Sequence, residues 1–221
     1  MIETNAVRAV LAALCLVLAS ACLAQTSDVP AAAALCVACH GGNGLGVADD
    51  VPALGGQHEH YLVDRLKRFS RPHSGSETMS SIVAAVGEAQ FREAANYFAR
   101  LPYLRKKQVV DPEKAERGKV VYQRVCQLCH IEEGRASTYV EYPLLASQSL
   151  PYLQKTMADI LAGRRMVDEV KMSMLSLLSA TPERIDEALQ FFASQEVDPA
   201  SMAVPAAGGQ KQRRRRFQAN P

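Results

Sequence analysis

Two pairs of cysteines, each followed directly by a histidine, are the residues of this chain best placed to do chemistry. The pattern C-x-x-C-H occurs from Cys36 to His40 and again from Cys126 to His130. Two thiols at this spacing can bond to the two vinyl groups of one haem, and the adjacent imidazole can ligate its iron. Because the pattern occurs twice, the sequence predicts two covalently bound haems c. The predicted cofactor-binding residues are Cys36, Cys39, Cys126 and Cys129, and the predicted proximal iron ligands are His40 and His130.

Other uses of these cysteines fit the sequence less well. Two C-x-x-C pairs could share one structural zinc ion, but that site would not require a histidine directly after each pair. The chain has six cysteines, and two of them, Cys15 and Cys22, belong to the N-terminal leader described below. The other four all lie in the haem motifs, so no disulfide framework is predicted.

The second axial ligand separates electron transfer from catalysis, because an iron with an open position can bind a substrate. The chain has five histidines, and those outside the two motifs are His58, His60 and His73, all in the first half. The second iron therefore has no local histidine, and a methionine is predicted there. At the first iron the predicted ligand is Met79, which is expected in a loop.

The second half offers several candidates for the methionine ligand: Met157, Met166, Met172 and Met174. The offset between equivalent residues of the two halves increases along the chain, and pairing Met79 with Met172 keeps that increase steady. Pairing Met79 with Met174 would require an insertion followed by a deletion. Met172 is therefore the favoured ligand and Met174 the alternative, whereas Met157 lies within a helical pattern and is expected in the core.

The N-terminus has the pattern of an export signal. Arg8 precedes an apolar run, Val10–Leu18, that is too short for a comfortable transmembrane helix, and small residues follow it. Cleavage after Ala21 or Ala24 would release a periplasmic protein. A retained signal anchor, or a lipoprotein linked at Cys22, is the weaker alternative.

The remaining sequence consists of helices and loops in two similar halves. Helices are predicted over about 28–40, 58–69, 88–101, 111–126, 151–163 and 181–195, and no strand is predicted. The predicted organisation is a signal peptide at 1–24, a first domain at 25–101, a linker at 102–110, a second domain at 111–197 and a disordered basic tail at 198–221. Within the second half, Gly118 and Tyr122 lie one helical turn apart, which predicts that the closing helix crosses close to them.

A second repeated segment follows each haem motif. Residues 52–61 and 143–152 share the pattern P-x-L-x-x-Q-x-x-x-Y. The carbonyl groups of Pro52 and Pro143 are expected to accept a hydrogen bond from the ligand histidines, since such partners orient a metal-bound imidazole. The glutamine and tyrosine of each segment are candidates to bind haem propionates.

With these motifs, and a methionine ahead of each closing helix, the sequence resembles the dihaem cytochrome c4 family over about 30–195. It is also similar to the haem subunit of flavocytochrome c sulfide dehydrogenases. The resemblance implies an all-α fold of two tandem class I cytochrome c domains, each wrapped on one covalent haem and related by a pseudo-twofold. It further implies a periplasmic protein that carries one electron per haem.

If both axial positions of each iron are filled, the protein is predicted to be an electron carrier without catalytic residues. A dihaem peroxidase would need one iron with an open axial position. The expected partners are redox proteins such as a dehydrogenase, a quinol-oxidising complex or a terminal oxidase. The alternative is the haem subunit of a periplasmic dehydrogenase complex. The formal net charge of +2 includes a basic run at 211–216. In an exported protein this run predicts at most weak contact with a membrane surface and no nucleic-acid binding.

Overall fold

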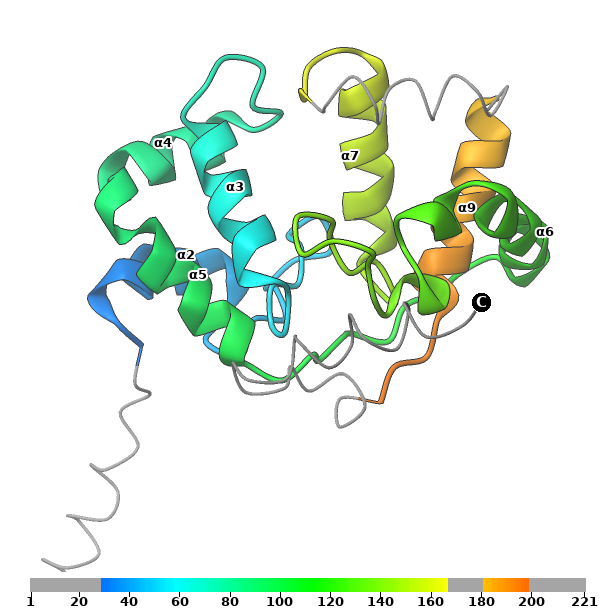
Figure 1. Cartoon of the computed structure of the whole chain (residues 1–221), viewed down its shortest axis with the longest axis horizontal. Coiled ribbons are helices and arrows are strands. Elements are labelled where there is room, and N and C mark those ends of the chain that lie inside the picture. Colours follow the sequence, from blue (N-terminus) through cyan, green and yellow to red (C-terminus); the bar gives the residue numbers. More distant parts are fainter. Residues whose placement is uncertain (1–28, 167–180, 199–221) are drawn as a thin grey trace, which may run out of the picture.

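The computed structural model describes residues 29–166 and 181–198, which form two helical halves side by side (Figure 1). All regular elements in these two ranges are helices, and strand pairing is limited there to an isolated bridge between Ser74 and Arg165. The all-α prediction is therefore confirmed. None of the helices in these ranges has the length and apolar character needed to cross a membrane.

The first half opens with a short helical segment that ends at the first haem motif. Its elements are η1 (Ala31–Ala33), α2 (Ala34–His40), α3 (Glu59–Phe69), α4 (Glu77–Val86), η2 (Glu88–Gln90) and α5 (Phe91–Arg100). The sequence did not predict α4, because a polar loop over 70–78 was expected to continue up to Met79. Instead the side chain of Ser76 caps α4 by accepting a hydrogen bond from the backbone N–H of Met79. Met79 therefore lies in the first turn of a helix.

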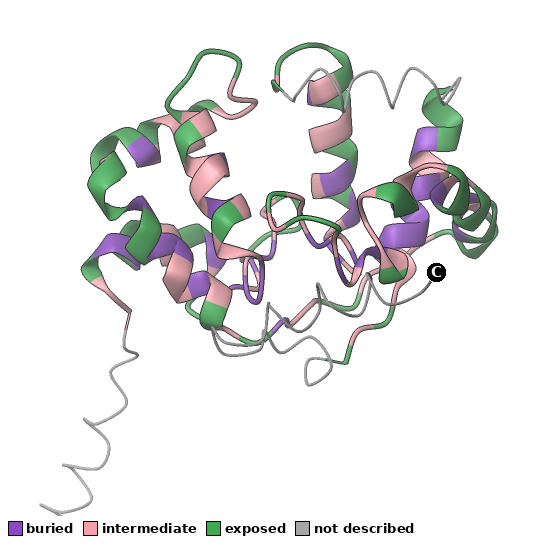
Figure 2. Ribbon diagram, viewed as in Figure 1, coloured by how far each residue is buried: buried purple, intermediate pink, exposed green. Residues whose placement is uncertain are grey.

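The core of the first half lies between α3, α5 and the segment before the haem motif. Helix α5 buries Phe91, Ala94, Ala95 and Phe98, at the spacing that places residues on one helix face. Leu62 of α3 and the segment at 32–33 close this core from the other side. Figure 2 shows that the buried residues gather at the base of the molecule, whereas much of the outer surface of α6 is exposed.

The second half repeats this plan with a longer opening helix. Its elements are α6 (Pro112–Arg124), η3 (Cys126–Leu128), η4 (Glu132–Gly134), α7 (Leu150–Leu161) and α9 (Pro182–Ser194). The start of α6 is as predicted: the carboxylate of Asp111 accepts hydrogen bonds from two backbone N–H groups of the first turn, and Pro112 follows it. Thr181 caps α9 in the same way, again with a proline next to it.

Helices α6 and α9 cross closely at Gly118, as the sequence predicts. A Cβ atom added at this position would collide with the backbone carbonyl of Glu187 in α9. One turn further along α6, the ring of Tyr122 stacks on Phe191, with 4.9 Å between ring centroids. The crossing brings α9 over the second haem motif, because Cys126 packs against the same core as Tyr122 and Phe192.

We expect Gly118→Ala to destabilise the second half. The added methyl group would force α6 and α9 apart, and overpacking of this kind costs about 1–3 kcal/mol. Urea denaturation should show the corresponding loss in the free energy of unfolding. Lys119→Ala, at an exposed position of the same helix, should change that free energy by less than about 0.5 kcal/mol. Equal stability of Gly118→Ala and the wild type would contradict the close crossing.

The segment that joins the two halves is anchored to both of them. The hydroxyl of Tyr103, a residue only 1 % exposed, donates to the carbonyl of Ala146 at 2.8 Å. The guanidinium of Arg105 lies over the Tyr103 ring, 3.4 Å from its centroid, and donates to the carbonyl of Gly55. Further along, the amide of Gln108 donates to three backbone carbonyls of the second half. This segment therefore restricts how the halves can move relative to each other.

Two equivalent glutamines join the halves by reciprocal hydrogen bonds. The amide of Gln57 donates to the carbonyl of Leu144 at 3.1 Å and accepts from its N–H at 2.9 Å. The amide of Gln148 makes the same pair of bonds to Ala53, at 2.9 and 3.0 Å. Gln57 and Gln148 occupy the same position of the repeated segment, as do Ala53 and Leu144. Each half thus uses the same groups to bind the other, which is the signature of a twofold relation.

Candidate haem-binding sites

The first site is centred on His40, the last residue of α2. Its Nδ1 lies 3.0 Å from the carbonyl oxygen of Pro52. A carbonyl can only accept, so Nδ1 carries the proton and Nε2 keeps its lone pair for a metal. Burial lowers the pKa of His40, although the bond to Pro52 partly opposes this, and the imidazole is therefore neutral at pH 7. The edge of the ring meets Phe98 of α5 at 6.1 Å between centroids.

The second site has the same arrangement around His130. Its Nδ1 lies 3.0 Å from the carbonyl oxygen of Pro143, and its ring meets Phe192 of α9 at 6.0 Å. The expected hydrogen bond from each ligand histidine to a proline carbonyl is therefore present in both halves. The motifs differ locally, because Cys36 and Cys39 lie in an α-helix whereas Cys126 begins a short 3-10 helix.

The four cysteines of the motifs form no disulfide, and the two pairs lie in different cores. Cys36 packs against the core of the first half and Cys126 against that of the second. Burial raises the pKa of Cys36, and it raises that of Cys126 to about 11. Both thiols are therefore protonated at neutral pH. A single zinc site shared by thiolates of both pairs does not fit this arrangement, whereas one haem per pair does.

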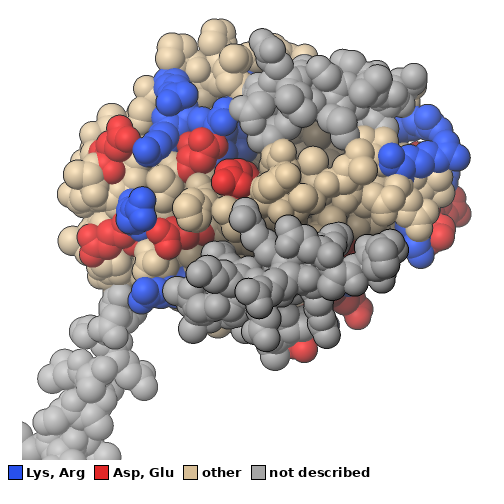
Figure 3. Space-filling model, in the orientation of Figure 1, with Lys and Arg blue, Asp and Glu red and all other residues tan. Residues whose placement is uncertain are grey.

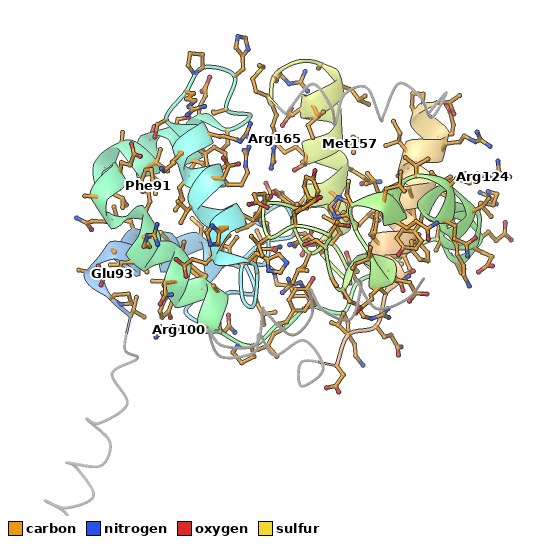
Figure 4. The ribbon with its side chains drawn as sticks, in the orientation of Figure 1. Phe91, Glu93, Arg100, Arg124, Met157 and Arg165 are labelled. Carbon is orange, nitrogen blue, oxygen red and sulfur yellow. The ribbon has the colours of Figure 1, made fainter. Side chains whose placement is uncertain are left out.

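The structure describes one of the two predicted methionine ligands. Met79 is half-buried in the first turn of α4. Met172 and the alternative, Met174, lie outside the described residues. Met157 of α7, which Figure 4 labels, packs against the core of the second half as expected, and Met166 is exposed.

The structure changes the expected role of the two glutamines and adds two residues that the sequence interpretation missed. Both glutamine amides are engaged in the interdomain hydrogen bonds to Ala53 and Leu144, so they are not free to bind propionates. The tyrosines of the repeated segments instead lie near two arginines, Arg65 and Arg165. The spacing of Tyr61 and Arg65, one turn apart in α3, was the available signal for the first arginine, and nothing local marks the second.

Comparisons with known proteins agree with this arrangement. The cytochrome c family profile matches residues 30–109. Cytochrome c4 of Azotobacter vinelandii is 29 % identical over 163 residues, which cover 66 % of this chain and 76 % of the relative. The thiosulfate dehydrogenase electron acceptor of Thiomonas intermedia (strain K12) is 28 % identical over 190 residues, covering 81 % of this chain and 87 % of the relative.

Among solved structures, reduced recombinant cytochrome c4 from Pseudomonas stutzeri superposes with a TM-score of 0.63. The superposition covers 74 % of this chain and 94 % of the other at 23 % identity. A likeness at this identity shows the fold, and the fold is that of two tandem class I cytochrome c domains. Residues 30–109 thus match the cytochrome c family profile, and the chain resembles the cytochromes c4 in sequence and in fold.

Proposed function

We propose that this protein carries single electrons between periplasmic redox partners through two haems, each ligated by one histidine and one methionine. Cys36 and Cys39 bind the first haem, Cys126 and Cys129 the second. The proposed iron ligands are His40 and Met79 at the first haem and His130 and Met172 at the second. The observation that carries the proposal is the identical histidine–proline hydrogen bond in the two halves, 3.0 Å in each.

The geometry suits reversible one-electron transfer, the chemistry that an iron with two protein ligands supplies. A histidine held through Nδ1 keeps its orientation when the charge on the metal changes. Phe98 and Phe192 restrict each ring further, because each packs edge-on against its histidine and is itself buried. Little therefore has to move in either half when an electron arrives or leaves.

The interdomain contact is directly connected to both haem sites. Pro52 holds His40, and the next residue, Ala53, binds Gln148 of the other half. In the second half, the carbonyl of Pro143 holds His130 in the same way, and the next residue, Leu144, binds Gln57. The orientation of each ligand and the position of the opposite half are thus fixed by adjacent residues. This supports electron exchange between the two haems of one chain.

Exposed apolar residues beside the haem motifs supply a contact surface for partners. Leu35 precedes the first motif and Leu128 lies within the second, and each is about half exposed. Val47, whose N–H donates to the carbonyl of Cys39, is also exposed. In Figure 3, basic and acidic residues are intermixed over the described part of the first half. Docking on these surfaces therefore relies on apolar contact more than on a patch of one charge.

Electron exchange between the two haems provides the test of this function. After the oxidised protein is partly reduced in a fast pulse, the exchange should follow a rate that does not depend on protein concentration. Both haems are held in one chain, so no encounter between molecules is needed. A rate that rises in proportion to protein concentration would show transfer between molecules and would contradict the proposal.

A variant pair connects this rate to the interdomain contact. Gln57→Ala combined with Gln148→Ala should slow the exchange, because it leaves buried backbone groups of both halves without partners, at about 1–3 kcal/mol each. Gln154→Ala is the matched control, since this glutamine is an exposed residue of α7 whose amide binds Asp186 of its own half. The control should exchange electrons at the wild-type rate.

A second candidate function is that of a haem subunit in a dehydrogenase complex. It is favoured by the similarity to the thiosulfate dehydrogenase electron acceptor, which extends over 81 % of this chain. Purification of the protein from native periplasm under mild conditions distinguishes the two. A catalytic subunit that copurifies in constant ratio supports the complex, whereas isolation of the cytochrome alone supports a free carrier.

A further inference from the structure

Two arginines at the boundary of the two halves have no carboxylate partner among the described residues. Arg65 of α3 is only 9 % exposed; it donates to the carbonyl of Ser74 at 3.3 Å, and its Nε has no hydrogen-bond partner. Arg165, just after α7, donates to the hydroxyls of Tyr152 and Thr156, at 3.4 and 3.0 Å. Figure 4 shows Arg165 in the space between α3 and α7.

The arginines next to them in sequence are paired in the ordinary way. Arg68, one turn after Arg65, binds the carboxylate of Asp64 at 2.6 Å. Arg164, which precedes Arg165, binds the carboxylate of Asp159 at 2.8 Å. Of these four arginines, the two at the domain boundary, Arg65 and Arg165, are therefore the ones without a carboxylate partner.

The pseudo-twofold explains why these two arginines meet. In the first half Gln57 precedes α3, and Tyr61 and Arg65 lie one helical turn apart in α3. The equivalent positions of the second half are Gln148, Tyr152 and Thr156, so α7 has a threonine where α3 has the arginine. Arg165 reaches back along α7 to that threonine. Its guanidinium thus supplies to the second half the positive charge that Arg65 supplies to the first.

The electrostatics of this cluster favour the binding of an anion. The pKa of Arg65 is lowered, first by burial and then by the charge of Arg165. Burial raises the pKa of Tyr61 to about 12. Burial also raises the pKa of Tyr152, but the charges of Arg165 and Arg65 and the hydrogen bonds with Arg165 and Thr156 together lower it below its usual value. A buried and a half-buried positive charge close to each other are costly without an opposite charge, and these four residues contain no negative group at neutral pH.

A carboxylate is the anion that this cluster fits best. A guanidinium presents a planar pair of N–H donors that matches the two oxygens of a carboxylate, and a tyrosine hydroxyl can donate a further bond. Each haem carries two propionate carboxylates. The glutamines that could otherwise have bound them are engaged with the opposite half.

We propose that Arg65, Arg165, Tyr61 and Tyr152 form one carboxylate site at the domain boundary, and that it holds propionate groups of both haems. This inference rests on haem attachment at both motifs. The two arginines act as positioning residues: each fixes a propionate and places a positive charge near the irons. Because the site is shared, the reduction potentials of the two haems depend on both arginines.

The test compares Arg65→Gln and Arg165→Gln with the matched controls Arg68→Gln and Arg164→Gln. The potentials of both haems are measured by spectroelectrochemical titration after two haems per chain have been verified. Removal of a nearby positive charge favours Fe(III), so both potentials should fall in each boundary variant. We expect at least a tenfold change in the redox equilibrium, which is 59 mV for one electron. The controls should remain close to the wild type, because each of these arginines pairs with a carboxylate of its own half.

Two further arms make the result decisive. Arg65→Lys should recover much of the lost potential, because it keeps the charge, whereas a merely structural role would not be sensitive to charge. The wild type in phosphate-free buffer should have the same potentials as in phosphate, because the anion is part of the haem. The proposal would be overturned if the reduction potentials of Arg65→Gln and Arg165→Gln shifted no more than those of the controls. It would also be overturned if the potentials of the wild type depended on phosphate. A wild type with fewer than two haems would instead refute the proposed function.

Discussion

Replacement of Cys126 and Cys129 together by alanine should lower the haem content from two per chain to one. On the proposed assignment each haem is bonded by the thiols of its own motif, and the two motifs pack into separate cores. The first half should therefore keep its haem, with the spectrum of the remaining centre unchanged. Denaturing gels stained for covalent haem, together with the absorbance of the reduced pyridine complex, measure the stoichiometry.

The mirror variant, with Cys36 and Cys39 replaced by alanine, is the control for this experiment. It should also retain one haem per chain, now in the second half. If either double variant still carries two covalent haems, the assignment of that motif is wrong. The loss of a haem should also weaken the half that contained it, because a small domain depends on the apolar body of its cofactor for part of its core.

Replacement of Met79 or Met172 by alanine should open one iron in each variant. The weak absorption band of the oxidised protein that reports sulfur–iron ligation should drop by about half in each. The affected haem should also lose reduction potential, because a methionine ligand raises it. Both quantities can be followed in one spectroelectrochemical titration.

Two other methionines of the second half serve as controls for the ligand assignment. Met157→Ala should keep the full band, because this side chain of α7 packs against the core; its effect should be on stability, as is usual for truncation of a packed side chain. A full band in Met172→Ala together with a reduced band in Met174→Ala would transfer the ligand role to Met174.

The sequence alone determined the features that depend on short-range chemistry. The C-x-x-C-H spacing predicted both haem motifs, since attachment requires thiols and imidazole within one turn of chain. The starts of α6 and α9 followed from Asp111 and Thr181, because a cap acts on the N–H groups of the next few residues. The proline carbonyls were found because their segment repeats at nearly the same distance from each motif.

Only the tertiary structure decided how the two halves use each other. Gln57 and Gln148 lie just before α3 and α7 in the sequence, but their hydrogen-bond partners lie in the opposite half. Helix α4 was missed because its start depends on the cap by Ser76, in a segment whose polar composition also suits a loop. Arg65 and Arg165 meet because the twofold packing brings α3 and α7 together. No local sequence pattern predicts that these two arginines lie close together, because their proximity arises only after both halves have folded and packed against each other.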